Sequence, residues 1–118
     1  MWSIVLGRIE RVNEQIKRDI GYIIQEELAD PRLMFVSITH VITSKDLRNA
    51  RVYFSVLGEK GQIEQARQSL EKASRVIRRE LGARLKMRFV PELHFHYDES
   101  IEYGARMEAK IREIQDES

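Results

Sequence analysis

The middle of the chain contains two strand-like segments separated by one long helical pattern, and this order strongly restricts the fold. In residues 50–57, ARVYFSVL, apolar residues alternate with others, as in a strand with one buried face. From about residue 62 to residue 85, apolar residues recur every three or four positions, as in an amphipathic helix. Residues 91–97, PELHFHY, alternate again. A strand, a helical crossover and a strand predict a right-handed connection with the helix over one face of a sheet.

The flanking segments add further elements to this unit. Residues 9–28 have apolar positions at helical spacing, and Asp30-Pro31 ends the predicted helix because a residue before proline avoids the helical conformation. Residues 34–41, MFVSITHV, predict a strand that pairs antiparallel with residues 50–57 across the polar turn TSKDLRN. Asp98 is placed to cap a last helix before the acidic tail.

The predicted fold class is therefore α+β. Its order is helix, strand, strand, helical region with a possible kink, strand, helix, with a three-stranded sheet and the helices on one face. This order is that of a type II KH-like domain. The same periodicities also fit other small split βαβ layouts.

Length and composition fit one such domain. The chain has 118 residues, so we expect a single KH-like domain over 1–118, with a core at about 7–105 and a C-terminal helix end and acidic tail at 106–118. The absence of cysteine excludes thiolate chemistry and disulfides and is typical of a reducing compartment. The N-terminal MWSIVLG lacks a leading basic residue, and no segment reaches the length of a membrane span. We therefore expect a cytoplasmic protein that does not bind membranes.

The net charge of +1 hides a strongly basic segment. Residues 72–88 carry seven basic side chains and one acidic side chain, whereas residues 98–118 carry three basic and seven acidic ones. On a helical wheel at about 100° per residue, the apolar positions of the long helix share one side. The opposite side carries Lys72, Arg75, Arg79 and Lys86. The wheel predicts a basic stripe that faces away from the core, as phosphate binding requires.

A solvated helix face usually mixes charges of both signs, with Glu placed four residues before Lys or Arg. The basic stripe has almost no compensating acid, which favours an anionic ligand over the alternative of an ordinary solvated face. We predict phosphate contacts from Lys72, Arg75, Arg78, Arg79, Arg84, Lys86 and Arg88. Arg8 and Arg11, in the first helix, form a second and weaker basic pair, for which a solvated helix start is an equally good interpretation.

Four sequence blocks occur in order along the chain: GRIERV at 7–12, EELADPRL at 26–33, SKDLRNARVYF at 44–54 and RFVPELHFHYDESIEYG at 88–104. In the last block the matching positions are Arg88, Pro91, Glu92, Leu93, Phe95, Asp98, Ser100 and Gly104. Together the blocks resemble the bacterial ribosome-binding factor A family over residues 7–105.

The resemblance implies a type II KH-like fold without enzymatic activity, and binding to the small (30S) ribosomal subunit during late maturation of 16S rRNA. A ribosomal protein or a release GTPase is a further candidate partner. The family's kink in the long helix corresponds here to Ala73, Ser74 and Arg75. Arg75 replaces the expected glycine, so a kink that requires positive φ is not supported at this position. A hydrogen bond from Ser74 to the preceding turn is an alternative cause of a bend. The basic residues named above are then expected to bind RNA, with Tyr53, Phe89, His94 and His96 as candidate stacking residues.

Other kinds of site have weaker support. His94 and His96 share one strand face and could bind a metal, but no third ligand is evident apart from Asp98, which is the predicted helix cap. Asp98 with Ser44 or His40 lacks the setting of a nucleophile. We therefore expect no catalytic residue, metal or cofactor.

A protein-interaction module is the second hypothesis. It would use the edge of the sheet or the acidic C-terminal helix to bind a protein partner. No extended heptad pattern is present, so we expect a monomer.

Overall fold

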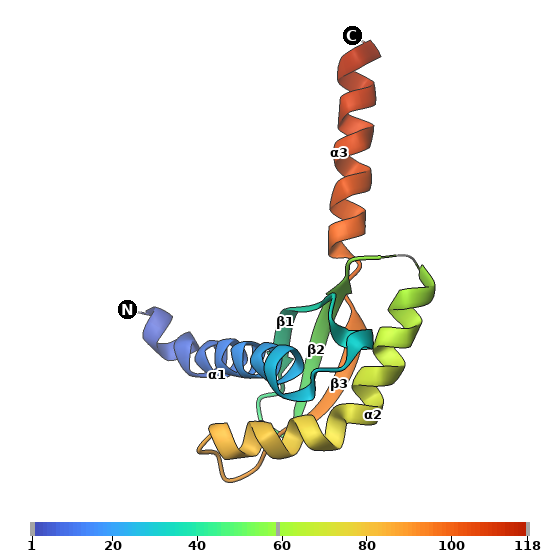
Figure 1. Cartoon of the computed structure of the whole chain (residues 1–118). Helices are drawn as coiled ribbons and strands as arrows, with labels where there is room; N and C mark the ends of the chain where they lie inside the picture. The colour runs from blue at the N-terminus through green and yellow to red at the C-terminus, as the bar shows by residue number, and fades with distance from the viewer. Residues whose placement is uncertain (1, 59, 118) are drawn as a thin grey trace.

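The computed structural model describes residues 2–58 and 60–117. Within these residues the chain forms, in order, α1 (Trp2–Tyr22), η1 (Ile23–Leu28), η2 (Pro31–Leu33), β1 (Val36–Thr43), β2 (Asn49–Val56), α2 (Lys60–Arg84), β3 (Glu92–Tyr97) and α3 (Ser100–Glu117). Figure 1 shows their arrangement, with α3 extending away from the other elements. The predicted α+β class and element order are confirmed.

The three strands form one mixed sheet in the order β1-β2-β3. β1 runs antiparallel to β2, as the polar loop between them predicts, and β3 runs parallel to β2 because α2 carries the chain back across the sheet. The register of β1 shifts between Ile38 and His40, which is a β-bulge. Before the bulge Val36 is buried, whereas after it Val41 and Thr43 are buried. The bulge therefore turns His40 to the face opposite that of Val36.

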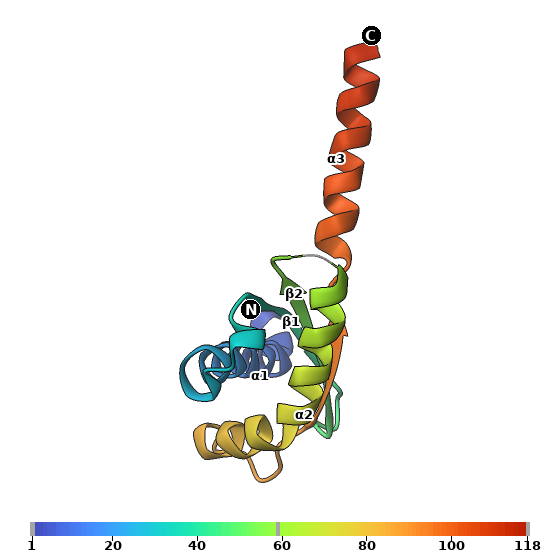
Figure 2. The same ribbon diagram turned by 45° about the vertical axis from the view of Figure 1, so that its right-hand side comes forward.

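One face of the sheet carries the core. Val52, Phe54, Leu93 and Phe95 of β2 and β3 are buried there against apolar residues of α1, η1 and α2. Figure 2 shows α1 and α2 on the same side of the sheet. The alternate residues of the strands, including Arg51 and His94, are exposed. The predicted placement on one face is confirmed for α1 and α2, whereas α3 extends away from the sheet.

The first helical region differs in detail from the prediction of one helix over residues 9–28. The helix begins at Trp2, and its last part is the π-helical turn η1. Ala29 follows with φ 47°, in the left-handed region. Asp30 then caps η2 by accepting a hydrogen bond of 2.9 Å from the backbone N–H of Arg32. The left-handed residue and the proline at the start of η2 end the helix where the sequence predicts.

α2 is a single helix that changes direction part-way along its length, as Figure 1 shows. None of its described residues has positive φ, so the bend does not need a glycine conformation at Arg75. The centring of the bend at Ala73, Ser74 and Arg75 stays a prediction. Because α2 ends at Arg84, the prediction that Lys86 continues its helical stripe is wrong. Lys86 lies in the non-helical connection to β3.

α3 points away from the core, and its described apolar side chains Met107, Ile111 and Ile114 are exposed. None of the described residues of α3 belongs to the buried cluster. None of the helices in the described part of the chain is both long and apolar enough to cross a membrane.

Candidate nucleic-acid interface

The side of α2 opposite its buried face carries solvent-facing cations, three of which belong to the predicted stripe. Lys72, Arg75 and Arg79 are exposed, whereas Leu70 and Ile77 on the opposite side are fully buried. Within the described residues, the side chains of Lys72 and Arg75 make no hydrogen bond or ion pair. Arg79 has one long contact of 3.7 Å with Glu80. These three cations therefore remain available for an anionic ligand, and burial of the apolar side holds them in place.

Two of the predicted contact residues make bonds within the protein. Arg78 donates a hydrogen bond of 3.0 Å to the backbone oxygen of Val90, which ties the connection after α2 to the helix. Arg84 pairs with Glu27 of η1, and its guanidinium carbon lies 4.5 Å from the centroid of the Tyr22 ring. The hydrogen bond to Glu27 raises the pKa of Arg84. Arg84 therefore joins α2 to the end of the first helical region, and its side chain is only partly accessible to a ligand.

A groove of about 440 Å³ lies where the first helix, the β1–β2 loop and the connection after α2 meet. The residues that line it are Arg8, Asp46, Leu47, Arg48, Lys86, Met87, Arg88 and Phe89. Four of these eight are basic and one is acidic. The groove brings Arg8 together with Lys86 and Arg88, which are far apart in the sequence. It also adds Arg48, which was not among the predicted contacts and whose only signal was its place in a polar turn.

Asp46 is the acidic residue of this groove, and its bonds hold the loop in shape. It accepts hydrogen bonds from the Ser44 hydroxyl at 2.6 Å and from the backbone N–H of Arg48 at 3.1 Å. These bonds, the Ser44 bond first, lower the pKa of Asp46. The next residue, Leu47, has φ 62°. The carboxylate therefore organises a tight turn that presents Arg48 to the groove.

Phe89 gives the groove an aromatic surface. Its side chain is 72% exposed, and the guanidinium carbon of Arg88 lies 5.7 Å from the centroid of its ring. Exposed aromatic and guanidinium planes next to cations are the groups on which unpaired bases stack. The groove can therefore hold both phosphate and base. We call the groove cations together with Lys72, Arg75 and Arg79 the basic surface.

Arg11 lies apart from the basic surface. It lines a shallow depression of about 560 Å³ together with Gly7, Glu10, Glu14, Gln15 and Arg18. The two glutamates offset the two arginines, so this depression has no net attraction for phosphate. Arg11 therefore corresponds to the solvated interpretation of the Arg8–Arg11 pair, while Arg8 belongs to the groove.

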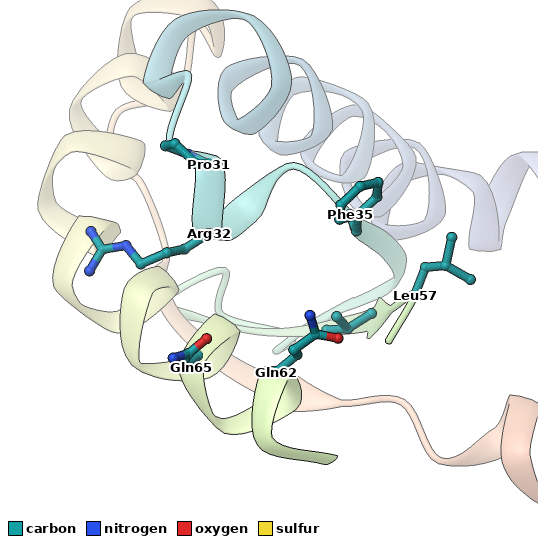
Figure 3. Close-up of a pocket in the computed structure, with 7 residues that line it drawn as sticks. Pro31, Arg32, Phe35, Leu57, Gln62 and Gln65 are labelled. Atoms are coloured by element: carbon teal, nitrogen blue, oxygen red, sulfur yellow. The ribbon is translucent and has the colours of Figure 1, made fainter. Parts of the chain in front are cut away.

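A third hollow, of about 240 Å³, lies near the opposite ends of the strands and is shown in Figure 3. Pro31, Arg32, Phe35, Val56, Leu57, Gln62 and Gln65 line it. Among the described residues that line it, Arg32 is the one cation, and it is paired with Asp30 at 3.0 Å. The hollow is therefore not a phosphate site.

His94 and His96 are exposed on the open face of the sheet. A nitrogen of the His94 ring lies 3.0 Å from the Asn49 side-chain oxygen. Within the described residues, no group of three possible metal ligands comes together.

Comparison with known proteins places this geometry in a family. The family model described as ribosome-binding factor A matches residues 8–111 of the chain. The chain belongs to the ribosome-binding factor A family. The matched residues include α2, the connection after it and all three strands.

Curated members of the ribosome-binding factor A family match nearly the whole chain. The chain is 45% identical over 107 residues to ribosome-binding factor A of Staphylococcus carnosus, covering 91% of this chain and 93% of that protein. It is 50% identical over 109 residues to ribosome-binding factor A of Acetivibrio thermocellus, covering 92% of this chain and 89% of that protein.

Solved structures of ribosome-binding factor A share the fold. The crystal structure from Thermus thermophilus superposes with a TM-score of 0.69 at 32% identity, covering 75% of this chain and 94% of that chain. A Thermus thermophilus homology model, fitted into a cryo-EM map of a complex of the 30S subunit with ribosome-binding factor A, superposes with a TM-score of 0.63 at 33% identity. It covers 74% of this chain and 91% of that chain. The predicted KH-like fold and family are thereby confirmed.

Proposed function

We propose that this protein binds the small ribosomal subunit and assists late maturation of its 16S rRNA, and that the basic surface is its RNA-binding site. Two observations carry the proposal: Lys72 and Arg75 expose charge without a partner among the described residues, and a separate groove is lined by four cations. The Thermus thermophilus relative described in a 30S complex supports the choice of subunit.

The proposed mechanism is non-enzymatic. The cations neutralise phosphates of one rRNA conformation, and the differential affinity raises the population of that conformation. A role of this kind needs no catalytic group, and it requires a cytoplasmic location because the ribosome is there. Arg78 and Arg84 act mainly by holding α2 in place, through Val90 and Glu27 respectively.

The test is co-sedimentation of the purified protein with small subunits, large subunits and whole ribosomes at two salt concentrations. We expect binding to small subunits that weakens with salt. Contact with five phosphates of unpaired RNA would give a slope of log K against log salt of about −3.5. Failure of the parent protein to bind small subunits at low salt would overturn the proposal.

A variant tests the site itself. Reversal of Arg75, Arg79 and Lys86 to glutamate is expected to abolish co-sedimentation, with folding checked by circular dichroism. The matched control reverses Arg32, Arg67 and Lys110, which lie outside the basic surface, and changes the net charge by the same amount. Equal binding by the two triple variants would show that the basic surface is not the site.

A protein-interaction module is the second candidate function, and one observation favours it. Met107, Ile111 and Ile114 of α3 are exposed at helical spacing, and α3 extends away from the core. Deletion of residues 106–118 tests this candidate. Loss of small-subunit binding on deletion, with affinity for isolated rRNA unchanged, would support a protein contact through α3.

A further inference from the structure

The open face of the sheet carries three aromatic rings in a row, one from each strand. His40 of β1 pairs in register with Tyr53 of β2, and Tyr53 pairs in register with His96 of β3. The centroids of the His40 and Tyr53 rings are 6.4 Å apart, and those of Tyr53 and His96 are 5.6 Å apart. We call these three residues the aromatic row. Because α1 and α2 lie on the other face, the aromatic row is directed to solvent.

The β-bulge creates this row. Simple alternation from Val36 and Ile38 would put His40 on the buried face of β1. The register shift between Ile38 and His40 instead places His40 opposite Tyr53. Both histidines are exposed and Tyr53 is half-buried. The bulge therefore directs the His40 ring to the open face, next to the rings of Tyr53 and His96. The core does not require this change of direction.

Charged groups of both signs surround the aromatic row. Arg51 lies beside Tyr53 on β2, with its Nη1 3.4 Å from the Tyr53 hydroxyl, and His94 is its partner on β3. Glu92 is the acidic residue at the start of β3. Asp98, beyond the end of β3, accepts hydrogen bonds of 2.5 Å from the hydroxyls of Thr39 and Ser100. Glu92 therefore lies at the far end of the face, whereas the Asp98 carboxylate lies near enough to His40 to interact with it electrostatically. The Tyr53 ring at the centre lies beside the Arg51 guanidinium.

We propose that the open face is a second RNA-contact surface, on which the aromatic row stacks unpaired bases and Arg51 binds an adjoining phosphate. This inference rests on the proposed function for the class of its ligand, an unpaired segment of RNA. Stacking of a base on an aromatic side chain strengthens binding and tolerates any sequence, because every base has a π-face. The row gives up to three such platforms, on the face that the basic surface does not use.

The experiment compares two fluorescent 12-nucleotide single strands, one of RNA with mixed sequence and one with the same backbone but abasic sugars. The row variant is His40→Ser, Tyr53→Leu and His96→Ser, and Tyr53→Phe is the conservative variant that keeps its ring. The matched control is Phe35→Leu, an exposed aromatic that lines the separate hollow of Figure 3. Circular dichroism and thermal unfolding establish that each variant is folded. If the row variant fails to fold, His40→Ser with His96→Ser replaces it.

We expect the row variant to lose about tenfold in affinity for the RNA, because one or more stacked bases are lost. Its affinity for the abasic strand and its salt slope should match those of the parent, because the phosphate contacts of the basic surface remain. Tyr53→Phe and Phe35→Leu should bind the RNA as the parent does. The reversal of Arg75, Arg79 and Lys86 should instead weaken binding of both strands and reduce the salt slope.

Unchanged RNA affinity in the row variant would overturn the inference while leaving the proposed function intact. The same holds if the row variant binds RNA normally but no longer co-sediments with small subunits, since the open face would then contact a protein. Equal loss of affinity for both strands would also overturn it, because the row would then act through charge or shape. Failure of the parent to bind small subunits would count against the proposed function separately.

Discussion

The guanidinium of Arg84 lies over the ring of Tyr22, with its central carbon 4.5 Å from the ring centroid. The two residues are distant in the sequence, since Tyr22 ends α1 and Arg84 ends α2. Glu27 pairs with the same guanidinium. Arg84, which was predicted from the sequence as a phosphate contact, therefore also connects two helical regions of the fold.

Arg84→Ala is expected to affect mainly stability, whereas Arg75→Ala is expected to affect mainly RNA binding. Arg84→Ala lowers the melting temperature by a few degrees, because its ion pair and ring contact join α2 to η1 and α1. Arg75→Ala leaves the melting temperature unchanged but reduces the salt slope of RNA binding by about 0.7, because one phosphate contact is lost. Thermal unfolding and RNA titration over a salt series measure both effects. If Arg84→Ala loses more free energy of RNA binding than free energy of unfolding, Arg84 belongs to the RNA site.

Asn13 is expected to matter for stability because it joins α1 to the end of β1. Its side-chain oxygen accepts hydrogen bonds from the backbone N–H of Thr43, at 2.9 Å, and from the Thr43 hydroxyl. Thr43 is buried. Asn13→Ala leaves the N–H of Thr43 without this partner and should lower the free energy of unfolding by about 1–3 kcal/mol in urea titrations.

Two variants complete this test. Asn13→Asp keeps an acceptor oxygen and should lose less stability than Asn13→Ala. Glu14→Ala changes the adjacent residue of α1 and should stay within about 0.5 kcal/mol of the parent. Similar losses in Asn13→Ala and Glu14→Ala would show that the Thr43 bond does not stabilise the fold.

Ala29→Gly is expected to stabilise the protein. Ala29 has φ 47°, which costs an L-residue about 1–2 kcal/mol and costs glycine almost nothing. The greater flexibility of glycine in the unfolded chain offsets about half of this gain, which leaves about 0.5–1 kcal/mol. The control Ala83→Gly changes an exposed residue in the last turn of α2 and should lower stability, by less than the ~1 kcal/mol of a helix interior. Urea unfolding distinguishes the signs, and a loss of stability in Ala29→Gly would contradict the left-handed conformation.

Asp98→Asn is expected to change how stability depends on pH. Hydrogen bonds from Ser100 and Thr39 hold the pKa of Asp98 below its ordinary value of 3.8 in the folded protein. A carboxyl group whose folded pKa is lowered stabilises the fold above its unfolded pKa, and this stabilisation is lost as the pH falls through the folded pKa. The parent should therefore be more stable than the variant at pH 7, and the difference should shrink below about pH 4. Thermal unfolding between about pH 2 and pH 7 measures it, and a constant difference would assign the effect to shape instead of charge.

Local periodicity predicted the elements and the face of each strand wherever no insertion disturbed it. Val52 and Phe54 of β2, and Leu93 and Phe95 of β3, are buried as their alternation predicts, because successive side chains of a strand point to opposite faces. The end of the first helical region at Asp30-Pro31 was also predictable, since proline restricts the residue before it. The four sequence blocks indicated the family because each of them is a short-range pattern of residues.

Contacts between residues distant in the sequence were decided only by the tertiary structure. The sequence did not indicate that Arg8 and Arg48 would join Lys86 and Arg88 in one groove, or that Arg84 would pair with Glu27. Nor did it reveal the face of β1 on which His40 lies, because a bulge depends on how two strands pair and leaves no mark in the periodicity of one strand. Periodicity within a segment follows from backbone geometry alone, so the sequence was sufficient to predict the type and the buried face of such a segment. Which charges and rings come together depends on how the segments pack, and only the folded chain contains that information.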